Sequence, residues 1–222
     1  MKSADDRWRQ AVGEEAGEAT MTPKNKPTIT RQRPKRVKPL LQQEPSNAFP
    51  PNCYKLPILS VDPDSQISSW AYFVGGELDR TGIVDHRKCT YPPDGLNTPI
   101  SQWAILLGGF PDLFHVVVEG QFMGINAQSM MRLVEMRTTV QCACDLVGVS
   151  YQTVLPGVWQ TAILARGFFT AKRKERKELS IQIASMRTGI EIDDDGIADA
   201  VCIGLWWLDQ VKAGKRQEIG KR

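Results

Sequence analysis

A short apolar run that ends on a carboxylate opens the patterned part of the chain. The stretch Leu56–Asp62 holds four apolar residues and is followed by the turn-forming sequence Pro63-Asp64-Ser65. A run this short favours a buried strand, because a helix needs about ten residues or more. It therefore predicts a central strand of an α/β sheet with Asp62 at its C-terminal end. Ligands gather at such ends, so Asp62 is either a solvated strand end or one wall of a site.

Two more strands are predicted directly after this one. Residues Trp70–Val74 are aromatic and β-branched, and Gly75-Gly76 follows them as a hairpin signal. Residues Glu77–Val84 are then predicted to form the returning strand. Consecutive strands joined by short turns favour an antiparallel three-strand meander, with the Leu56–Asp62 strand at one side.

The rest of the chain alternates between helical and strand patterns. A second buried strand, His115–Glu119, also ends on a carboxylate. Apolar residues at helical spacing predict helices, and alternating or β-branched residues predict strands. We expect helices over Thr98–Gly108, Ala127–Val147, Trp159–Leu164, Lys172–Met186 and Asp195–Val211, and a strand over Val149–Leu155. This order predicts an α/β fold.

The N-terminal residues 1–52 are predicted to be a disordered tail. Seven Lys and Arg residues occur between Lys24 and Lys38 without one acid, mixed with prolines that block helix and sheet. The segment is either a solvated tail or a mobile arm that contacts a polyanion. Met21 is a second possible start site. We expect one folded domain over 53–213 and a short basic tail over 214–222.

Composition limits the class of protein. With 222 residues and 41% hydrophobic content, the chain can bury one ordinary core. The net charge of +3 is small, but acids and bases collect in separate stretches, which points to a charged partner. No apolar run approaches the roughly 20 residues of a membrane span, and no signal peptide is evident. The sequence predicts a cytoplasmic protein without a membrane partner.

The cysteines and histidines do not predict a zinc site. Five cysteines are an odd number, and only Cys142 and Cys144 lie close together. Their one-residue gap is not a usual ligand spacing, and His86 and His115 form no partner motif. We expect reduced, mostly buried thiols.

A cluster of acids opens the last predicted helix. Asp194 and Asp195 fall in its first turn, where the helix dipole favours negative charge, so simple capping accounts for them. Asp199 is not explained in this way. It lies one turn further on, between apolar residues, and shares a face with Asp195 at i, i+4 spacing.

These acids could converge if the last helix packs beside the two strands that end on carboxylates. Three or four carboxylates within a few ångströms repel one another and lose solvation unless a cation lies among them. Oxygen-rich sites of this kind suit Mg²⁺ or Mn²⁺ rather than zinc. Two such ions could activate water and stabilise the leaving oxygen in phosphodiester cleavage.

Several motifs resemble the RuvC family of Holliday-junction resolvases, within the RNase H-like nucleases, and particularly its phage-type branch. The resemblance covers roughly residues 57–209, and its specificity lies in the order and spacing of the motifs. The motifs are Leu59-Ser60-Val61-Asp62-Pro63, Val117-Val118-Glu119-Gly120-Gln121-Phe122, Asn126-Ala127-Gln128-Ser129, Glu135-Met136-Arg137, Leu155-Pro156, Trp159-Gln160, the basic run Ala171–Lys177, and Asp195-Gly196-Ile197-Ala198-Asp199-Ala200.

The resemblance implies a two-metal endonuclease with an RNase H-like mixed sheet, made of the antiparallel meander plus parallel strands and flanked by helices. Asp62, Glu119 and Asp199 would bind two Mg²⁺ ions, with Mn²⁺ as a substitute, and no nucleotide cofactor is implied. The fourth ligand would be Asp195, or Asp194 in its place. Such an enzyme would act in the cytoplasm of a bacterium or of a phage's host.

The sequence departs from the family pattern in three places. Asp64 stands where a glycine is usual, and Gly196 stands where many relatives have an acid or a histidine. Trp159 and Gln160 stand where the bacterial pattern has a lysine. The resemblance therefore leaves Lys172 and Lys174 as the cations facing the scissile phosphate.

The resemblance also implies contacts with branched DNA and a homodimer. The basic run is either the solvated first half of a helix or a phosphate-contacting surface, and Phe122 either contacts bases near the crossover or lies at the core edge. The long helix Ala127–Val147 is a candidate for part of the dimer interface. The predicted DNA-contacting residues are Phe122, Arg166, Lys172, Arg173, Lys174, Arg176 and Lys177.

Three functions fit these features. The first is a resolvase that cuts four-way junctions, and the second is a broader nuclease that debranches DNA. The third is a junction-binding protein without catalysis, which is disfavoured because an uncompensated acidic cluster repels DNA. An actin-like phosphotransferase also begins with a strand ending in Asp, but no glycine-rich phosphate loop follows Asp62 or Glu119.

Overall fold

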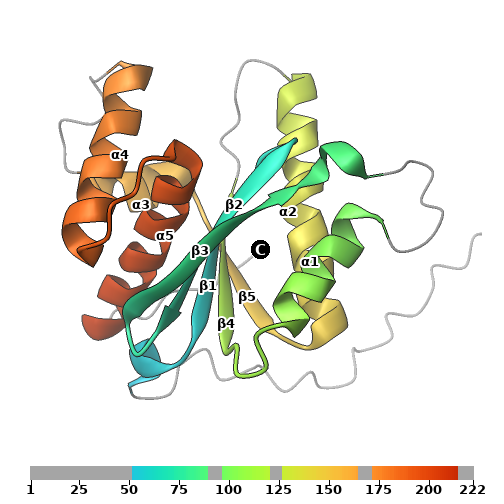
Figure 1. Cartoon of the computed structure of the whole chain (residues 1–222), viewed down its shortest axis with the longest axis horizontal. Helices are drawn as coiled ribbons and strands as arrows, with labels where there is room; N and C mark the ends of the chain where they lie inside the picture. Colours follow the sequence, from blue (N-terminus) through green and yellow to red (C-terminus); the bar gives the residue numbers. More distant parts are fainter. Residues whose placement is uncertain (1–51, 90–96, 121–126, 165–171, 215–222) are drawn as a thin grey trace, which may run out of the picture. The chain divides into compact units, whose positions relative to one another are not determined.

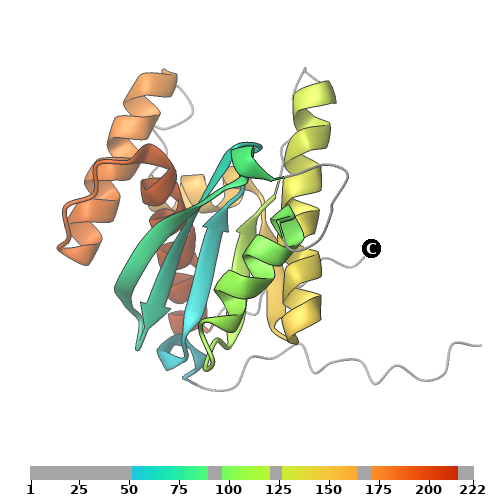
Figure 2. The ribbon, with the colours of Figure 1, turned by 45° about the vertical axis from the view of Figure 1, so that its right-hand side comes forward.

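The chain folds into a mixed five-stranded sheet with helices on both faces (Figures 1 and 2). The computed structural model describes residues 52–89, 97–120, 127–164 and 172–214, all within one compact unit, Glu44–Arg222. The predicted N-terminal tail and most of the predicted C-terminal tail lie outside the described residues, as do Phe122 and Arg166.

The sheet has the predicted mixture of antiparallel and parallel strands. Its order is β3-β2-β1-β4-β5. The first three strands form the predicted antiparallel meander, and β4 and β5 continue the sheet in parallel with β1. The strands are β1 Ile58–Asp62, β2 Ile67–Val74, β3 Glu77–Asp85, β4 His115–Glu119 and β5 Ser150–Val154.

Two strands begin two or three residues away from the predicted start, and the ends of β3 and β5 shift by one residue. Strand β1 begins at Ile58 rather than Leu56, since Pro57 has no N–H to donate to a neighbouring strand. The Pro57 carbonyl instead accepts a hydrogen bond from the backbone N–H of Phe114 at 2.9 Å. Strand β2 begins at Ile67, because pairing with β3 extends beyond the aromatic stretch that predicted it.

The α-helices of the described residues divide between the two faces of the sheet. Helices α1 and α2 cover one face, and α3, α4 and α5 lie on the other (Figure 1). Helix α3 begins at Pro156, earlier than predicted, because proline fits the first turn of a helix. No described helix has the length and hydropathy to cross a lipid bilayer. The helices are α1 Pro99–Gly108, α2 Ala127–Val147, α3 Pro156–Ile163, α4 Arg173–Thr188 and α5 Asp195–Lys212.

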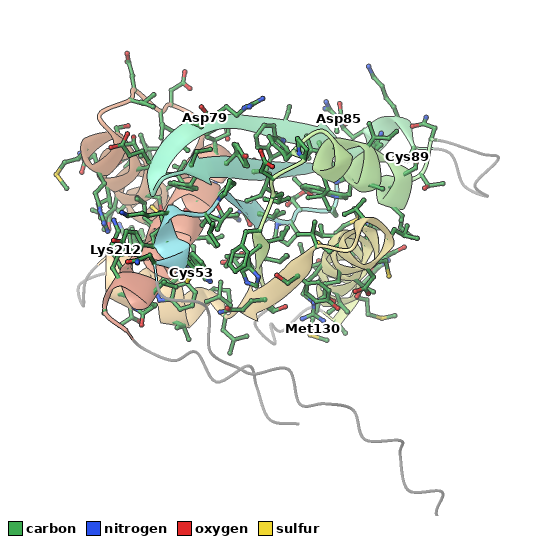
Figure 3. All side chains as sticks on the ribbon, turned by 90° about the horizontal axis from the view of Figure 1, so that it is seen from below. Cys53, Asp79, Asp85, Cys89, Met130 and Lys212 are labelled. Carbon is green, nitrogen blue, oxygen red and sulfur yellow. The ribbon has the colours of Figure 1, made fainter. Side chains whose placement is uncertain are left out.

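The central strands are buried on both faces, as their short apolar runs predicted. Along β1, Ile58 faces the α3–α5 side, and Leu59 and Val61 face the α1–α2 side. All three are inaccessible to solvent. Figure 3 shows side chains filling the layers on either side of the sheet. The C-terminal ends of β1 and β4 are therefore set by two packed cores.

Helix α5 lies in close contact with the sheet. The Ser60 hydroxyl of β1 donates a hydrogen bond of 2.6 Å to the carbonyl of Ala200. Gly204 permits this approach, since a Cβ atom there would lie only 2.2 Å from the Phe73 ring. Contact at both residues fixes the N-terminal half of α5 beside the C-terminal end of β1. The acids at the start of α5 are thereby carried to the acid that ends β1.

Candidate active site

Two acids meet where the parallel strands β1 and β4 end. The register that pairs Val61 with Val118 places Asp62 beside Glu119. Both side chains are half-buried, and they share a hydrogen bond. The structure thus brings together the two strand-end carboxylates that the sequence singled out.

Helix α5 adds acids to the same place. Asp194 is the N-cap, and its Oδ1 accepts a 2.8 Å hydrogen bond from the N–H of Ile197. Asp195 is the first residue of the helix, and Asp199 lies one turn further on, close enough to Asp62 to raise its pKa. Because capping occupies an oxygen of Asp194, Asp195 is the better candidate for a fourth ligand.

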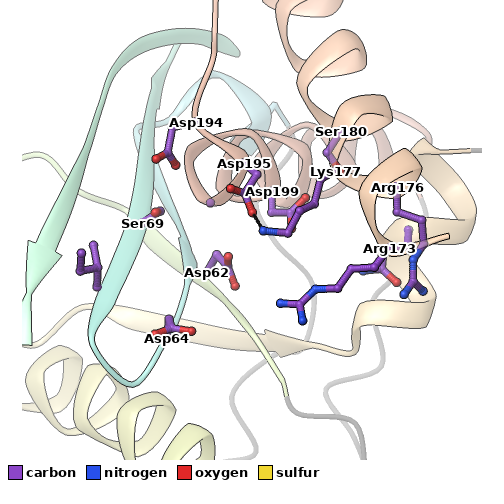
Figure 4. A pocket seen from close by; sticks show the side chains of 13 residues that line it. Asp62, Asp64, Ser69, Arg173, Arg176, Lys177, Ser180, Asp194, Asp195 and Asp199 are labelled. Atoms are coloured by element: carbon purple, nitrogen blue, oxygen red, sulfur yellow. Dashed lines mark hydrogen bonds and ion pairs between the residues drawn. The ribbon is translucent and has the colours of Figure 1, made fainter.

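These acids line a pocket of about 450 Å³ that has a basic wall opposite them. Figure 4 shows Asp62, Asp195 and Asp199 on one side and the basic side chains of α4 on the other. Glu119 does not line the pocket, but it shares a hydrogen bond with Asp62, which does. The lining residues are Asp62, Asp64, Ile67, Ser69, Gln160, Arg173, Arg176, Lys177, Ser180, Asp194, Asp195, Gly196 and Asp199.

The basic wall differs from the expected pair of lysines. Neither Lys172 nor Lys174 lines the pocket. Lys172 is the exposed N-cap of α4, and Lys174 pairs with Glu178 at 3.7 Å with 89% of its side chain exposed. Positions three and four apart share a helix face, which turns Arg173, Arg176 and Lys177 toward the pocket instead.

Two neutral hydrogen-bond donors at the acids were not predicted. The buried Trp159 indole Nε1 donates to Glu119 Oε1 at 2.7 Å. The buried Ser180 hydroxyl donates to Asp199. The sequence pattern placed Trp159 in a predicted helix and in the family resemblance without linking it to an acid, and no signal in the sequence pointed to Ser180. Each donor fixes the orientation of one carboxylate, Ser180 from the pocket lining and Trp159 from the core.

Burial makes the acids hard to ionise without a cation. Loss of solvation raises the pKa of Glu119 to about 7, although the Trp159 hydrogen bond opposes the change. Burial also raises the pKa of Asp199 to about 6, against the hydrogen bond from Ser180. Burial and the charges of Glu119 and Asp199 raise the pKa of Asp62 well above its usual range. A bound cation would reverse these shifts by favouring the ionised forms.

The donor set fits a hard divalent ion. The candidate ligands are all carboxylate oxygens, which suit Mg²⁺ or Mn²⁺. Among the described residues, no three acids, histidines or cysteines are already arranged as a metal-binding group. Two of the candidate ligands already have other partners, since Lys177 pairs with Asp195 and Trp159 donates a hydrogen bond to one oxygen of Glu119. Binding an ion would require local adjustment of these side chains.

Replacing Asp199 with asparagine should stabilise the metal-free protein at high pH. Above these raised pKa values, the folded state holds ionised carboxylates in a buried place, whereas the unfolded chain exposes them to water. The free energy of unfolding therefore falls as the pH rises from about 4 to about 7. Asp199→Asn removes one such charge. We expect a gain of about 1–3 kcal/mol at pH 8 in urea unfolding with a chelator present. The gain should narrow towards pH 4, and a variant less stable than wild type at pH 8 would refute this reading.

Comparison with known proteins supports the fold assignment. No family model matches the sequence, and a search of curated proteins finds no match. Among solved structures, T. thermophilus RuvC in complex with a Holliday junction substrate aligns with a TM-score of 0.57 at 16% identity, covering 72% of this chain and 97% of that chain. A second Thermus thermophilus RuvC structure gives 0.55 at 16% identity, covering 72% and 98%. The predicted RNase H-like α/β fold, in the arrangement found in RuvC, is thereby confirmed.

Proposed function

We propose that this chain, with its RuvC-like fold, is a Mg²⁺-dependent DNA endonuclease that resolves four-way junctions. One observation carries the proposal: half-buried carboxylates from β1 and α5 line a pocket whose opposite wall is basic, and the β4 carboxylate of Glu119 shares a hydrogen bond with the β1 acid. An acidic group that can hold cations, facing side chains that can hold phosphate, is what hydrolysis of a phosphodiester requires.

The acids would hold the metal. Asp62, Glu119 and Asp199, with Asp195 as the fourth ligand, would bind two Mg²⁺ ions, and Mn²⁺ would substitute. Divalent metal supplies the Lewis acidity that activates water and stabilises the leaving oxygen. Trp159 and Ser180 would keep Glu119 and Asp199 oriented, as hydrogen-bond partners outside a metal site commonly do.

The basic wall would bind and orient the DNA. Arg173, Arg176 and Lys177 would neutralise backbone phosphate, which gives affinity without sequence preference. They also favour the added negative charge of the phosphate at the transition state. Water would form the new bond to phosphorus as the bond to the 3′ oxygen breaks, leaving 5′-phosphate ends.

Symmetric resolution of a junction would require two sites, and we propose a homodimer. An apolar groove of about 830 Å³ lies between α1 and α2. Ile105 and Leu146 line it and are 68% and 71% exposed. Large exposed apolar side chains at a groove are typical of protein–protein contacts. A second copy of the chain packed through α1 and α2 would cover them.

A cleavage assay tests the proposed function. The full chain should cut a synthetic four-way junction in Mg²⁺ at paired sites on opposite strands, and it should cut a linear duplex with the same arm sequences far more slowly. Asp199→Asn should bind the junction without cutting it. Equal cutting of forks, flaps and junctions would favour the broader debranching nuclease. Binding without cutting in Mg²⁺ or Mn²⁺ would favour a non-catalytic junction-binding protein.

A further inference from the structure

Lys177 joins the two walls of the pocket. Its Nζ forms an ion pair with Asp195 Oδ2, which connects α4 to the first turn of α5 (Figure 4). The two side chains are 43% and 44% exposed, so the pair lies at the mouth of the site rather than in the core. Arg173 extends into the same pocket from the preceding turn of α4.

This ion pair uses a carboxylate that a metal ion would need. Asp195 is the remaining acid of the α5 face that could act as a ligand, because Asp194 caps the helix. A carboxylate oxygen held by an ammonium group is less available to a divalent ion. Two cations at one carboxylate also repel each other. Lys177 and a metal ion at this position therefore compete.

Lysine is suited to exchange partners. Its ammonium group is a compact charge on a flexible four-carbon stem, whereas the arginine guanidinium is a rigid fork. Once displaced from Asp195, the ammonium group of Lys177 would still lie on the basic wall, within the pocket that DNA phosphate would enter. The contact with Asp195 and a contact with phosphate are thus alternatives for one side chain.

We propose that Lys177 is a placeholder cation, which neutralises Asp195 in the metal-free protein and is released to the DNA phosphate when a divalent ion binds. The inference rests on the proposed function only for the phosphate step. Because metal binding frees a phosphate-binding group, and phosphate binding removes a competitor of the metal, each ligand should strengthen the binding of the other.

Mn²⁺ titration of the DNA-free full chain by calorimetry tests the placeholder role. Lys177→Met removes the competing charge and keeps most of the side-chain volume. Its Mn²⁺ affinity should be about two- to five-fold tighter than that of wild type, the range expected from losing a half-exposed ion pair. Cleavage of a four-way junction should move in the opposite direction, by on the order of ten-fold or more. Lys177→Arg keeps the charge and should show no gain in Mn²⁺ affinity.

Two controls separate the ion pair from a general charge effect. Lys174→Met makes the same charge change on the same helix but outside the pocket, and it should leave Mn²⁺ affinity unchanged. In an Asp195→Asn background, Lys177→Met should no longer tighten binding. Thermal unfolding of each variant checks that it is folded.

The outcomes distinguish the placeholder role from the proposed function. Unchanged or weaker Mn²⁺ binding by Lys177→Met overturns the placeholder role, as does equal tightening by Lys174→Met or tightening that persists with Asp195→Asn. The predicted Mn²⁺ pattern without any cleavage of DNA supports the placeholder role and refutes the nuclease. Junction cleavage by wild type without the Mn²⁺ pattern supports the nuclease and overturns the placeholder role.

Discussion

Replacing Asp62 with asparagine is expected to abolish Mg²⁺-dependent cleavage of a four-way junction. The rate should fall by on the order of 10³-fold or more, because Asp62 shares a hydrogen bond with Glu119, lies close enough to Asp199 for its pKa to be raised by that charge, and would be lost as a metal ligand. Single-turnover kinetics with saturating protein measure the effect. Binding of the junction should persist, since the basic wall on α4 is unchanged.

Asp64 provides the matched control for this variant. It lines the same pocket and carries the same charge, but it is exposed and its Oδ1 accepts a hydrogen bond from the N–H of Gln66 within a turn. Asp64→Asn should lower the rate by less than about ten-fold, as expected for an exposed charge that is screened by solvent. Equal losses from the two variants would show that net charge, rather than ligation by Asp62, governs the rate.

Replacing Trp159 with phenylalanine should lower the cleavage rate by about 10- to 100-fold, the usual cost of losing a hydrogen-bond partner of a metal ligand. The substitution keeps the buried ring but removes the N–H that donates to Glu119. Because Trp159 is buried and has no path to DNA, kcat should fall while KM stays close to that of wild type.

Trp103 allows the loss of packing to be separated from the loss of the hydrogen bond. It is equally buried, it belongs to the core on the opposite face of the sheet, and its Nε1 has no hydrogen-bond partner among the described residues. Trp103→Phe should therefore reduce stability without the fall in kcat. A Trp159→Phe variant whose kcat matches that of Trp103→Phe would exclude a positioning role for Trp159.

The fold was largely predictable because its signals are local. Short apolar runs marked β1 and β4, Gly75-Gly76 marked the hairpin, and helical spacing marked α2 and α5. Boundaries were less predictable where pairing extended a strand, as at Ile67 in β2. The resemblance to RuvC implied a meander plus parallel strands, but the order of the strands was not predicted, since pairing between distant strands leaves little trace in one sequence.

The candidate acids of the site were also predictable from local signals. Asp62 and Glu119 end buried strands, and Asp199 is an acid that capping does not explain. The residues of the basic wall were not predictable, because any of the clustered Lys and Arg residues could face the pocket. The choice depends on the rotation of α4, and that is set by Ser180 and Ala184, which are buried along the same helix.

Contacts between elements far apart in the chain could not be predicted. Trp159 reaches Glu119 across 40 positions, and Ser60 reaches Ala200 across 140. Such contacts depend on how closely helices approach the sheet. Gly204 sets that distance for α5, yet a glycine within a helix pattern does not reveal which ring it lies against.

The most direct measurement is anomalous diffraction from a crystal of the full chain grown with Mn²⁺. The proposed site predicts two Mn²⁺ peaks about 4 Å apart. They should be coordinated by the carboxylates of Asp62, Glu119 and Asp199, with Lys177 no longer paired to Asp195. The absence of a peak in this pocket, or Mn²⁺ bound elsewhere while these three acids remain without metal, would contradict the nuclease site.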